Sequence, residues 1–340
     1  MPIRRLIHRT AHGLERGLDR RRRPRTSGRA IISPYRGFGR GNEMLIRGRV
    51  LLEKAITRAT GAESLWRNAV NTWRRFKSDE LAGVRVVATY RDSVVESISD
   101  DEGHFQIRLA PHVLDHTRLW HEVGLALPDR NNVTAVAHVM MPPEDADFAI
   151  ISDIDDTVLV TNATSLLGMA RSVIRNAATR LPFEGVADLY RALHRDRNPI
   201  FYVSSSPWNL YELLHDFMEL NKIPHGPMFL QDWGLSETTL LMAGHEEHKL
   251  AQIQTLVDYY PTLRFVLIGD SGQHDPEIYL RVIQTHPGRV LAAFVRDVTP
   301  DIRDQGVARI IEQSNAAGVE MLYVRDSAEA MEHARRMGLS

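Results

Sequence analysis

The sequence contains no cysteine, no long apolar run and almost no net charge. Without cysteine the chain has no disulfide, thiol nucleophile, iron–sulfur cluster or cysteine-ligated zinc, which suits a reducing compartment such as the cytoplasm. No apolar stretch reaches the roughly 20 residues that a transmembrane helix needs. What remains, 43% hydrophobic and 25% charged residues in a chain of 340, is typical of a soluble globular protein of about two domains.

The net charge of −1 conceals a strongly basic N-terminal segment. Residues 1–30 hold ten arginines and two acidic residues, a net charge of +8, so the remaining chain carries −9. Arg4 and Arg5 resemble the start of a secretion signal, but no apolar region of about 7–15 residues follows, and we reject that interpretation.

Two interpretations of this basic arm stay open. One is a solvated, disordered arginine tail, of the kind also found in nucleic-acid-binding arms. The other is an amphipathic helix, because apolar residues between positions 3 and 18 share one helical face, and such a helix can lie on an anionic membrane. For the arm we expect an anionic membrane surface and no nucleic acid as partner, in a cytoplasmic protein that can associate peripherally with membranes.

The composition divides the chain into three parts. Residues 20–44 are rich in arginine, glycine, serine and proline, so we expect 1–44 to form the arm and a linker. Within it, the two aromatics of PYRGFG (34–39) are expected to dock on a folded part. Residues 45–143 show alternating apolar positions, which predicts a β-sandwich-like domain. Its expected elements are a helix at 63–76 and strands at 45–53, 83–90, 99–109, 120–127 and 133–141.

Residues 144–340 follow a different pattern. Short, fully apolar segments alternate with helical ones, which predicts an α/β fold with a doubly wound parallel sheet. In such a sheet, ligands bind at the carboxyl ends of the strands. The expected strands are 148–152, 199–203, 227–230, 264–268, 290–295 and 321–324, and the expected helices include 184–194, 209–220 and 247–260.

Polar residues follow several of these strands. Asp153 and Asp155 end the first, where two close carboxylates raise one pKa unless a cation lies between them. They fit a divalent metal site and an acid that can hold a proton. Asp270 follows Gly269 at the end of the fourth strand, and with Asp275 it supplies oxygen ligands of the kind that Mg²⁺ prefers. A turn that uses aspartate and glycine is the alternative.

The second strand ends in Ser204-Ser205-Ser206-Pro207. Here Ser206 fits a helix N-cap and Pro207 the first helical position, so hydroxyl and backbone N–H groups can bind phosphate at a helix N-terminus. The alternative is that these residues only cap the helix. Lys249, at the start of the helix before the fourth strand, is by itself equally consistent with a surface charge.

In this order, these residues resemble the haloacid dehalogenase-like phosphatase superfamily, whose first motif is Asp-x-Asp-x-Thr/Val after an apolar strand. Within it, ISDIDDTV, YVSSSPWNLY and FVLIGDSGQHDPEIY resemble the catalytic domain of the yeast actin-patch phosphatidate phosphatase family. PYRGFG and the sandwich segment are similar to the bacterial members of that family.

The resemblance implies a role for each matched residue. Asp153 would be the nucleophile that takes the phosphoryl group, and Asp155 the general acid and then base. Ser204 would hydrogen-bond the phosphoryl group and Lys249 would neutralise it. Mg²⁺ would be bound by Asp153, Asp270 and the backbone carbonyl of Asp155, with Asp275 either a direct ligand or a residue that supports one. Asp156 has no role in the pattern, and Thr157 is expected to orient the loop.

The implied function is Mg²⁺-dependent hydrolysis of phosphatidate, a phosphorylated lipid, to diacylglycerol and phosphate through an aspartyl-phosphate intermediate. The gaps between the motifs leave no room for a large cap domain, which suits a substrate embedded in a surface. Trp208, Phe229 and Trp233 could enter a membrane interface or could pack in the core. The alternatives are another phosphomonoester as substrate, and a membrane-binding module with a catalytically silent core.

Overall fold

The computed structural model describes residues 28–53, 80–155, 157–158, 183–231, 241–272, 274–298 and 304–340. Several predictions therefore lie outside the described residues. They are the conformation of the arm at 1–27, the helix at 63–76, the content of the first gap between 159 and 182, and the placement of Asp156 and Trp233.

The C-terminal part is the α/β fold that the sequence predicts. Six strands form one sheet in the order β10-β9-β8-β11-β12-β13, and every neighbouring pair is parallel. All six predicted strands are confirmed within a few residues, because each is a short, mainly apolar run, and all but the edge strand β13 are buried almost throughout. They are β8 (Ala149–Asp153), β9 (Ile200–Pro207), β10 (Met228–Gln231), β11 (Phe265–Asp270), β12 (Val290–Arg296) and β13 (Glu320–Val324).

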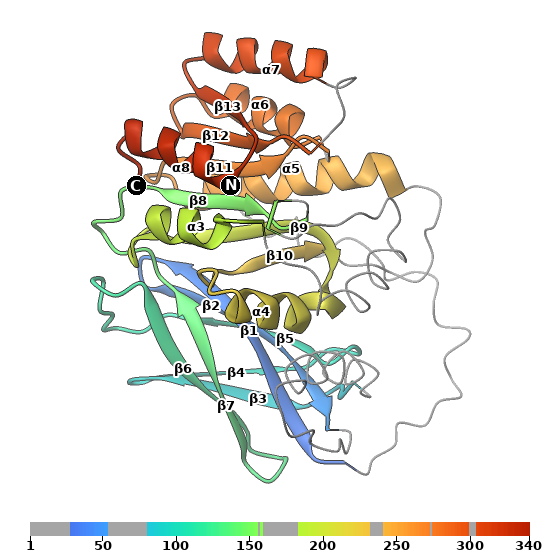
Figure 1. The fold of residues 1–340 in the computed structure, drawn as a ribbon. Helices are drawn as coiled ribbons and strands as arrows, with labels where there is room; N and C mark the ends of the chain where they lie inside the picture. The colour runs from blue at the N-terminus through green and yellow to red at the C-terminus, as the bar shows by residue number, and fades with distance from the viewer. Residues whose placement is uncertain are drawn as a thin grey trace.

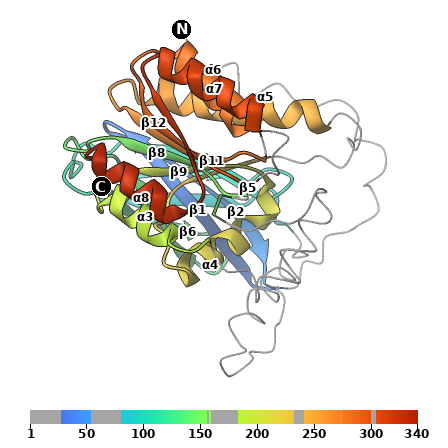
Figure 2. The ribbon, with the colours of Figure 1, turned by 45° about the horizontal axis from the view of Figure 1, so that its top comes forward.

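Helices cover both faces of this parallel sheet (Figures 1 and 2). One face packs against α3, α4 and α8 and the other against α5, α6 and α7, so the sheet separates two hydrophobic cores. The helices are α3 (Val186–His194), α4 (Tyr211–Leu220), α5 (Leu241–Tyr259), α6 (Asp275–Thr285), α7 (Asp304–Ala316) and α8 (Ser327–Arg336), with a short 3₁₀ turn, η2 (Trp208–Leu210), before α4.

The N-terminal part is a single seven-stranded sheet in the order β4-β3-β6-β7-β1-β2-β5. All of its neighbouring strands are antiparallel except β1 and β7, which are parallel. The sheet curls until β4 and β5, at opposite ends of the order, touch around a third hydrophobic core. Its strands are β1 (Ala30–Arg40), β2 (Glu43–Leu52), β3 (Arg85–Tyr90), β4 (Ser93–Ile98), β5 (His104–Leu109), β6 (Trp120–Leu127) and β7 (Val133–Met140).

Strand β1 corrects two sequence predictions. Residues 30–40 are not a linker but a strand that pairs with β2 on one side and β7 on the other. Because β1 joins these neighbours, the seven strands of the N-terminal part form one continuous sheet. The β-sandwich expected for this part is therefore not confirmed. The placement of the domain boundaries at residues 44 and 143 otherwise stays a prediction.

The docking of PYRGFG on a folded part is confirmed. Tyr35 belongs to the core on one face of the parallel sheet, and Phe38 belongs to the core on the other. The Tyr35 ring stacks on Trp208 at a centroid distance of 5.0 Å, and the Phe38 ring lies 5.3 Å from that of Phe229. Strand β1 therefore ties the curled sheet to the α/β part, through contacts with β9, β10 and the turn η2 that follows β9.

Within the described part of the chain, no helix is long and apolar enough to cross a membrane.

Candidate active site

The carboxyl ends of β8, β9 and β11 meet because these strands are parallel neighbours in the sheet. Asp153 is the last residue of β8 and Asp270 the last of β11, while Ser204 follows the residue of β9 that pairs with Asp153. The fourth participant, Lys249, comes from α5, and the fifth, Asp275, begins α6. All five side chains are buried. Charged residues are rarely buried unless they are paired, so this edge of the sheet is an unusual concentration of buried polar groups.

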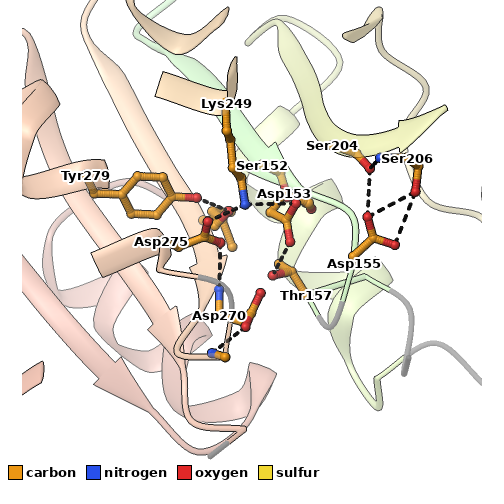
Figure 3. Close-up of polar contacts among 12 residues, drawn as sticks. Ser152, Asp153, Asp155, Thr157, Ser204, Ser206, Lys249, Asp270, Asp275 and Tyr279 are labelled. Carbon is orange, nitrogen blue, oxygen red and sulfur yellow. Dashed lines mark hydrogen bonds and ion pairs between the residues drawn. The ribbon is translucent and has the colours of Figure 1, made fainter. Parts of the chain in front are cut away.

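Lys249 is the cation at the centre of this site (Figure 3). Its Nζ lies 3.0 Å from Oδ1 of Asp153 and forms a second ion pair with Oδ1 of Asp275. Burial alone lowers the pKa of Lys249, but the carboxylates of Asp153, Asp275 and Asp270 outweigh it and raise that pKa. The lysine is therefore held in its charged form, and the alternative of a surface charge is wrong.

The acidic groups outnumber this cation. Burial raises the pKa of Asp153 well above its usual value, Lys249 acts in the opposite direction, and the carboxylates of Asp275, Asp270 and Asp155 raise it further. The pKa of Asp275 is also raised by burial, against the pull of Lys249. A buried excess of negative charge is costly unless a further cation or protons compensate it.

Three of the carboxylates are arranged to hold a metal ion. One oxygen each from Asp153, Asp270 and Asp275 lies within 4.8 Å of the other two, and all three residues are buried. Oxygen donors with a high negative charge are the donor set that Mg²⁺ prefers. The residues present therefore fit the divalent ion that the resemblance implies, and the excess charge supplies a reason for it to bind.

Gly269 brings Asp270 and Asp275 together. The backbone N–H of Asp270 donates to Oδ2 of Asp275 at 3.0 Å. At Gly269 a Cβ atom would collide with the Asp275 carboxylate and lie 2.5 Å from the Tyr279 hydroxyl, which itself donates to the Ile268 carbonyl. Only glycine leaves room for this approach. Asp270 is fixed further by the Gly272 N–H, which donates to its Oδ1 at 2.6 Å.

Asp155 turns away from Lys249 and toward β9 (Figure 3). The Ser204 hydroxyl donates to Oδ2 of Asp155 at 2.7 Å, and the Ser206 hydroxyl donates to the same oxygen at 3.1 Å. The backbone N–H of Ser206 donates in turn to Oγ of Ser204 at 2.9 Å. The two aspartates thus have separate surroundings, a lysine for Asp153 and a pair of hydroxyls for Asp155.

The helix cap predicted at Ser206 and Pro207 is wrong. Strand β9 continues through Pro207, and neither η2 nor α4 has a side-chain cap. Ser206 instead belongs to the site, a role that sequence reasoning missed because a serine before proline is also a good cap. The one feature of the local sequence that could have predicted this role is the spacing of two residues between Ser204 and Ser206, which places both side chains on the same side of a strand.

All six residues that the sequence predicts as catalytic or metal-binding lie at this one edge: Asp153, Asp155, Ser204, Lys249, Asp270 and Asp275. Thr157 is adjacent, since its hydroxyl donates to Oδ2 of Asp153 at 3.4 Å, as expected for a residue that orients the loop.

The aromatic residues near the strand ends pack inward. Phe229 is buried in the core, and Trp208 packs against the core and stacks on Tyr35. The guanidinium of Arg47 lies over both rings, 5.2 Å from the centroid of Trp208 and 5.5 Å from that of Phe229. For Phe229 the core interpretation is confirmed, and Trp208, which is half-buried, packs against the core on the other face of the sheet.

Comparison with known proteins assigns the part of the chain that carries this site. Residues 148–297 match the model of the catalytic domain of phosphatidate phosphatase APP1. Asp153, Asp155, Ser204, Lys249, Asp270 and Asp275 all lie inside the matched segment.

Two fungal proteins are similar over this region. Phosphatidate phosphatase APP1 of Saccharomyces cerevisiae is 32% identical over 162 residues, 46% of this chain and 27% of that protein. An uncharacterized protein of Schizosaccharomyces pombe is 30% identical over 159 residues, 45% of this chain and 26% of that protein. The chain thus spans about a quarter of the length of these two fungal proteins.

Solved structures show a more distant likeness. Phosphoserine phosphatase from T. onnurineus has a TM-score of 0.31 and 12% identity, over 56% of this chain and 96% of that one. Cytosolic 5'-nucleotidase IIIB bound to cytidine has a TM-score of 0.33 and 9% identity, over 57% of this chain and 88% of that one.

Proposed function

We propose that this protein is a Mg²⁺-dependent phosphatidate phosphatase, which hydrolyses phosphatidate to diacylglycerol and phosphate through an aspartyl-phosphate on Asp153. The observation that carries the proposal is the buried group of Asp153, Lys249, Asp270 and Asp275 inside the segment that matches the APP1 catalytic domain. Activity as a phosphoric monoester hydrolase follows from that match, and phosphatidate is the substrate that the name of the yeast relative prints.

Asp153, Asp270 and Asp275 would hold Mg²⁺, with the backbone carbonyl of Asp155 as a further ligand. When bound, Mg²⁺ supplies positive charge that screens the phosphate dianion from the attacking carboxylate. Lys249 adds to this screening from its place between Asp153 and Asp275. Both oxygens of Asp275 already hold other groups, Lys249 and the Asp270 N–H, so Asp275 also keeps the lysine and the end of β11 in place.

In the first step, an oxygen of Asp153 forms a bond to phosphorus and the bond from phosphorus to the glycerol oxygen breaks. The electron pair goes to the leaving oxygen, which takes a proton from Asp155. In the second step, Asp155 takes a proton from a water molecule whose oxygen attacks phosphorus, and the Asp153 carboxylate leaves. Dividing the reaction in this way replaces one difficult displacement with two easier ones.

Before the reaction, the hydroxyls of Ser204 and Ser206 hold the Asp155 carboxyl group on the β9 side of the site, ready to turn toward the substrate. Once Asp155 turns toward the leaving oxygen, Ser204 is released and can donate to the phosphoryl oxygens. The lipid assignment also draws on the basic arm at 1–27, through which we propose peripheral binding to an anionic membrane surface in the cytoplasm, without nucleic acid as a partner.

The test measures phosphate release from phosphatidate in detergent micelles and from a soluble aryl phosphate, each with Mg²⁺ and with EDTA. The wild-type chain is compared with Asp153→Asn and with Asp188→Asn, which alters an exposed carboxylate of α3. We expect release that requires Mg²⁺, retained in Asp188→Asn and reduced roughly 10⁴-fold or more in Asp153→Asn.

Each other outcome overturns a defined part of the proposal. Full activity in EDTA removes the metal, and full activity in Asp153→Asn removes the aspartyl-phosphate. Activity on the aryl phosphate alone indicates another phosphomonoester as substrate. No activity on either ester, with vesicle binding intact, indicates a membrane-binding module with a silent core.

A further inference from the structure

A groove of about 480 Å³ lies between the curled sheet and helix α4 of the α/β part. Residues 31–36 of β1 form one wall of this β1–α4 groove, together with Leu51 of β2 and Val136 of β7. Helix α4 forms the opposite wall, and its lining residues include Glu212 and Glu219. None of these residues belongs to the active site described above.

The groove lies where β1 separates from β7. These two strands pair only at Gly37 with Val139 and at Phe38 with Met140. Before that point, β1 pairs with β2 alone and β7 pairs with β6 alone, within the part of the chain that the structure describes. Each strand therefore keeps one edge without a strand partner, and such edges can pair with an extended segment.

The sheet side of the groove presents apolar side chains. Ile31 and Leu51 lie directly opposite each other in the register of β1 and β2, and both line the groove. Val136 is 49% exposed. A segment that covers these three side chains removes apolar surface from water, which stabilises its docking.

The charged residues give the groove a net negative charge. Glu212 and Glu219 line it, against the single guanidinium group of Arg36. Burial lowers the pKa of Arg36, and the charge of Glu219 acts against that effect. Burial also lowers the pKa of His138, which is therefore neutral at pH 7. The groove thus suits a segment that combines positive charge with aliphatic surface.

The basic arm, residues 1–27, joins the described structure at the end of this groove. The Glu53 N–H donates to the Arg29 carbonyl at 2.7 Å, so the chain enters β1 beside the end of β2 and two residues before Ile31. The eight residues nearest this entry, 20–27, read RRRRPRTS. Fully extended they span up to about 28 Å, more than the roughly 20 Å of six strand residues. Their length is therefore sufficient to follow the groove along 31–36.

We propose that the β1–α4 groove is the docking site of the arginine-rich segment 20–27 of the same chain. The segment would reverse direction before β1 and lie along residues 31–36. The aliphatic stems of its arginines would cover Ile31 and Val136, while their guanidinium groups pair with the exposed Glu219. The tether at the groove gives this segment a high effective concentration there. A docked segment is not free to bind a membrane, so the groove and an anionic membrane would compete for the same arginines.

The test follows the cleavage of the full-length chain by trypsin, which cuts after arginine and lysine, and identifies the products by mass spectrometry. It needs no lipid, metal or substrate, so its failure is distinct from a failure of the proposed function. The bonds after Arg20, Arg21, Arg22 and Arg25 should be cut at least about tenfold more slowly than in a synthetic peptide of residues 1–30, because the segment must first leave the groove. The protection should decrease when NaCl rises from about 0.05 M to about 0.5 M.

Two variants place a positive charge on opposite walls of the groove. Val136→Lys and Glu219→Lys should each increase these cleavage rates about tenfold, because like charges then face the arginines. Val94→Lys, at a 64% exposed valine of β4, and Glu332→Lys, at an exposed glutamate of α8, are the matched controls. Both lie outside the groove and should stay within about twofold of the wild type. Should one groove variant lose its cooperative thermal transition, the other, on a different element, still decides.

Three outcomes overturn the proposal. The first is cleavage of the arm at the rate of the peptide, or an equal effect of groove and control variants. The second is acceleration confined to the bonds after Arg67, Arg74 and Arg75, which would assign the groove to residues 54–79. The third is protection that disappears on dilution, which would assign it to the arm of a second copy of the chain.

Discussion

At the scale of single residues, Ser206 adds a second hydroxyl group that holds the Asp155 carboxylate. Its hydroxyl and that of Ser204 hold the same carboxylate, yet the sequence resemblance assigns a role only to Ser204. The reason is conformational, because β9 stays extended through Pro207 and so carries alternate residues to the same side. Sequence alone leaves this undecided, since Ser-Pro is equally typical of a helix start.

Replacement of Ser206 by alanine should lower kcat about 10- to 100-fold with little change in KM. The loss corresponds to one hydrogen bond to a charged group, here Asp155, which transfers protons in the mechanism proposed above. Steady-state kinetics on the phosphomonoester substrate measure it. Ser97→Ala, in β4, should behave as the wild type, and a raised KM with unchanged kcat would show that Ser206 contacts the substrate instead.

Gly269 is the second residue whose replacement has a defined consequence. In Gly269→Ala the new methyl group displaces the Asp275 carboxylate and with it the ion pair to Lys249. We expect a loss of about 1–3 kcal/mol in the free energy of unfolding, typical of overpacking, and a large loss of activity. Urea denaturation measures the free energy of unfolding, and phosphate release measures the activity.

Gly306→Ala, in α7, is the control for this change, because no atom lies within 4 Å of its added Cβ. Alanine inside a helix should stabilise by up to about 1 kcal/mol relative to glycine. Equal effects of the two substitutions would contradict the role given to Gly269.

At the scale of elements, the apolar strands were predictable and β1 was not. Each strand of the parallel sheet is a short run of apolar residues, so its end, and the acid or hydroxyl that follows, can be located from the sequence. The sequence of β1 predicts a linker because it contains proline, glycine and arginine. In the structure this segment is a strand because it pairs with β2 and β7. Its conformation depends on tertiary contacts that no local pattern reports.

Phe38→Ala should cost about 3–5 kcal/mol of unfolding free energy, as other buried phenylalanines do. The ring packs against Phe201, Phe229 and Tyr259 of the α/β part, so its loss loosens the contact between the two parts. Chemical denaturation followed by fluorescence measures the cost. The control is Val94→Ala, a change at a side chain that is 64% exposed, for which we expect a change within about 0.5 kcal/mol.

At the scale of the whole molecule, the half-buried His225 makes stability depend on pH. Burial lowers the pKa of His225 to about 3, and the charges of Arg36, His215 and His138 act in the same direction. Below a pH of about 6.5 the unfolded chain takes up a proton at this position while the folded chain does not. Stability from this group is therefore complete above that pH and declines as the pH falls toward 3.

Between pH 7.5 and pH 5 this group should lower the urea midpoint, so the midpoint of His225→Gln should fall less, or rise more, than that of the wild type. Buried carboxylates such as Asp153, whose pKa is raised, act in the opposite direction, so the difference between variant and wild type isolates the histidine. A variant with an unchanged slope would show that His225 is protonated in the folded chain.

The contacts of β1 also bear on where the chain can be cut. A fragment limited to residues 148–297 would keep the matched catalytic segment but lose Tyr35 and Phe38, which cover apolar surface on both faces of its sheet. It would lose β13 as well, leaving β12 as an unprotected edge. Low solubility of such a fragment would report missing partners rather than a defective active site, so activity should be compared between family members only on chains that retain the equivalent of β1.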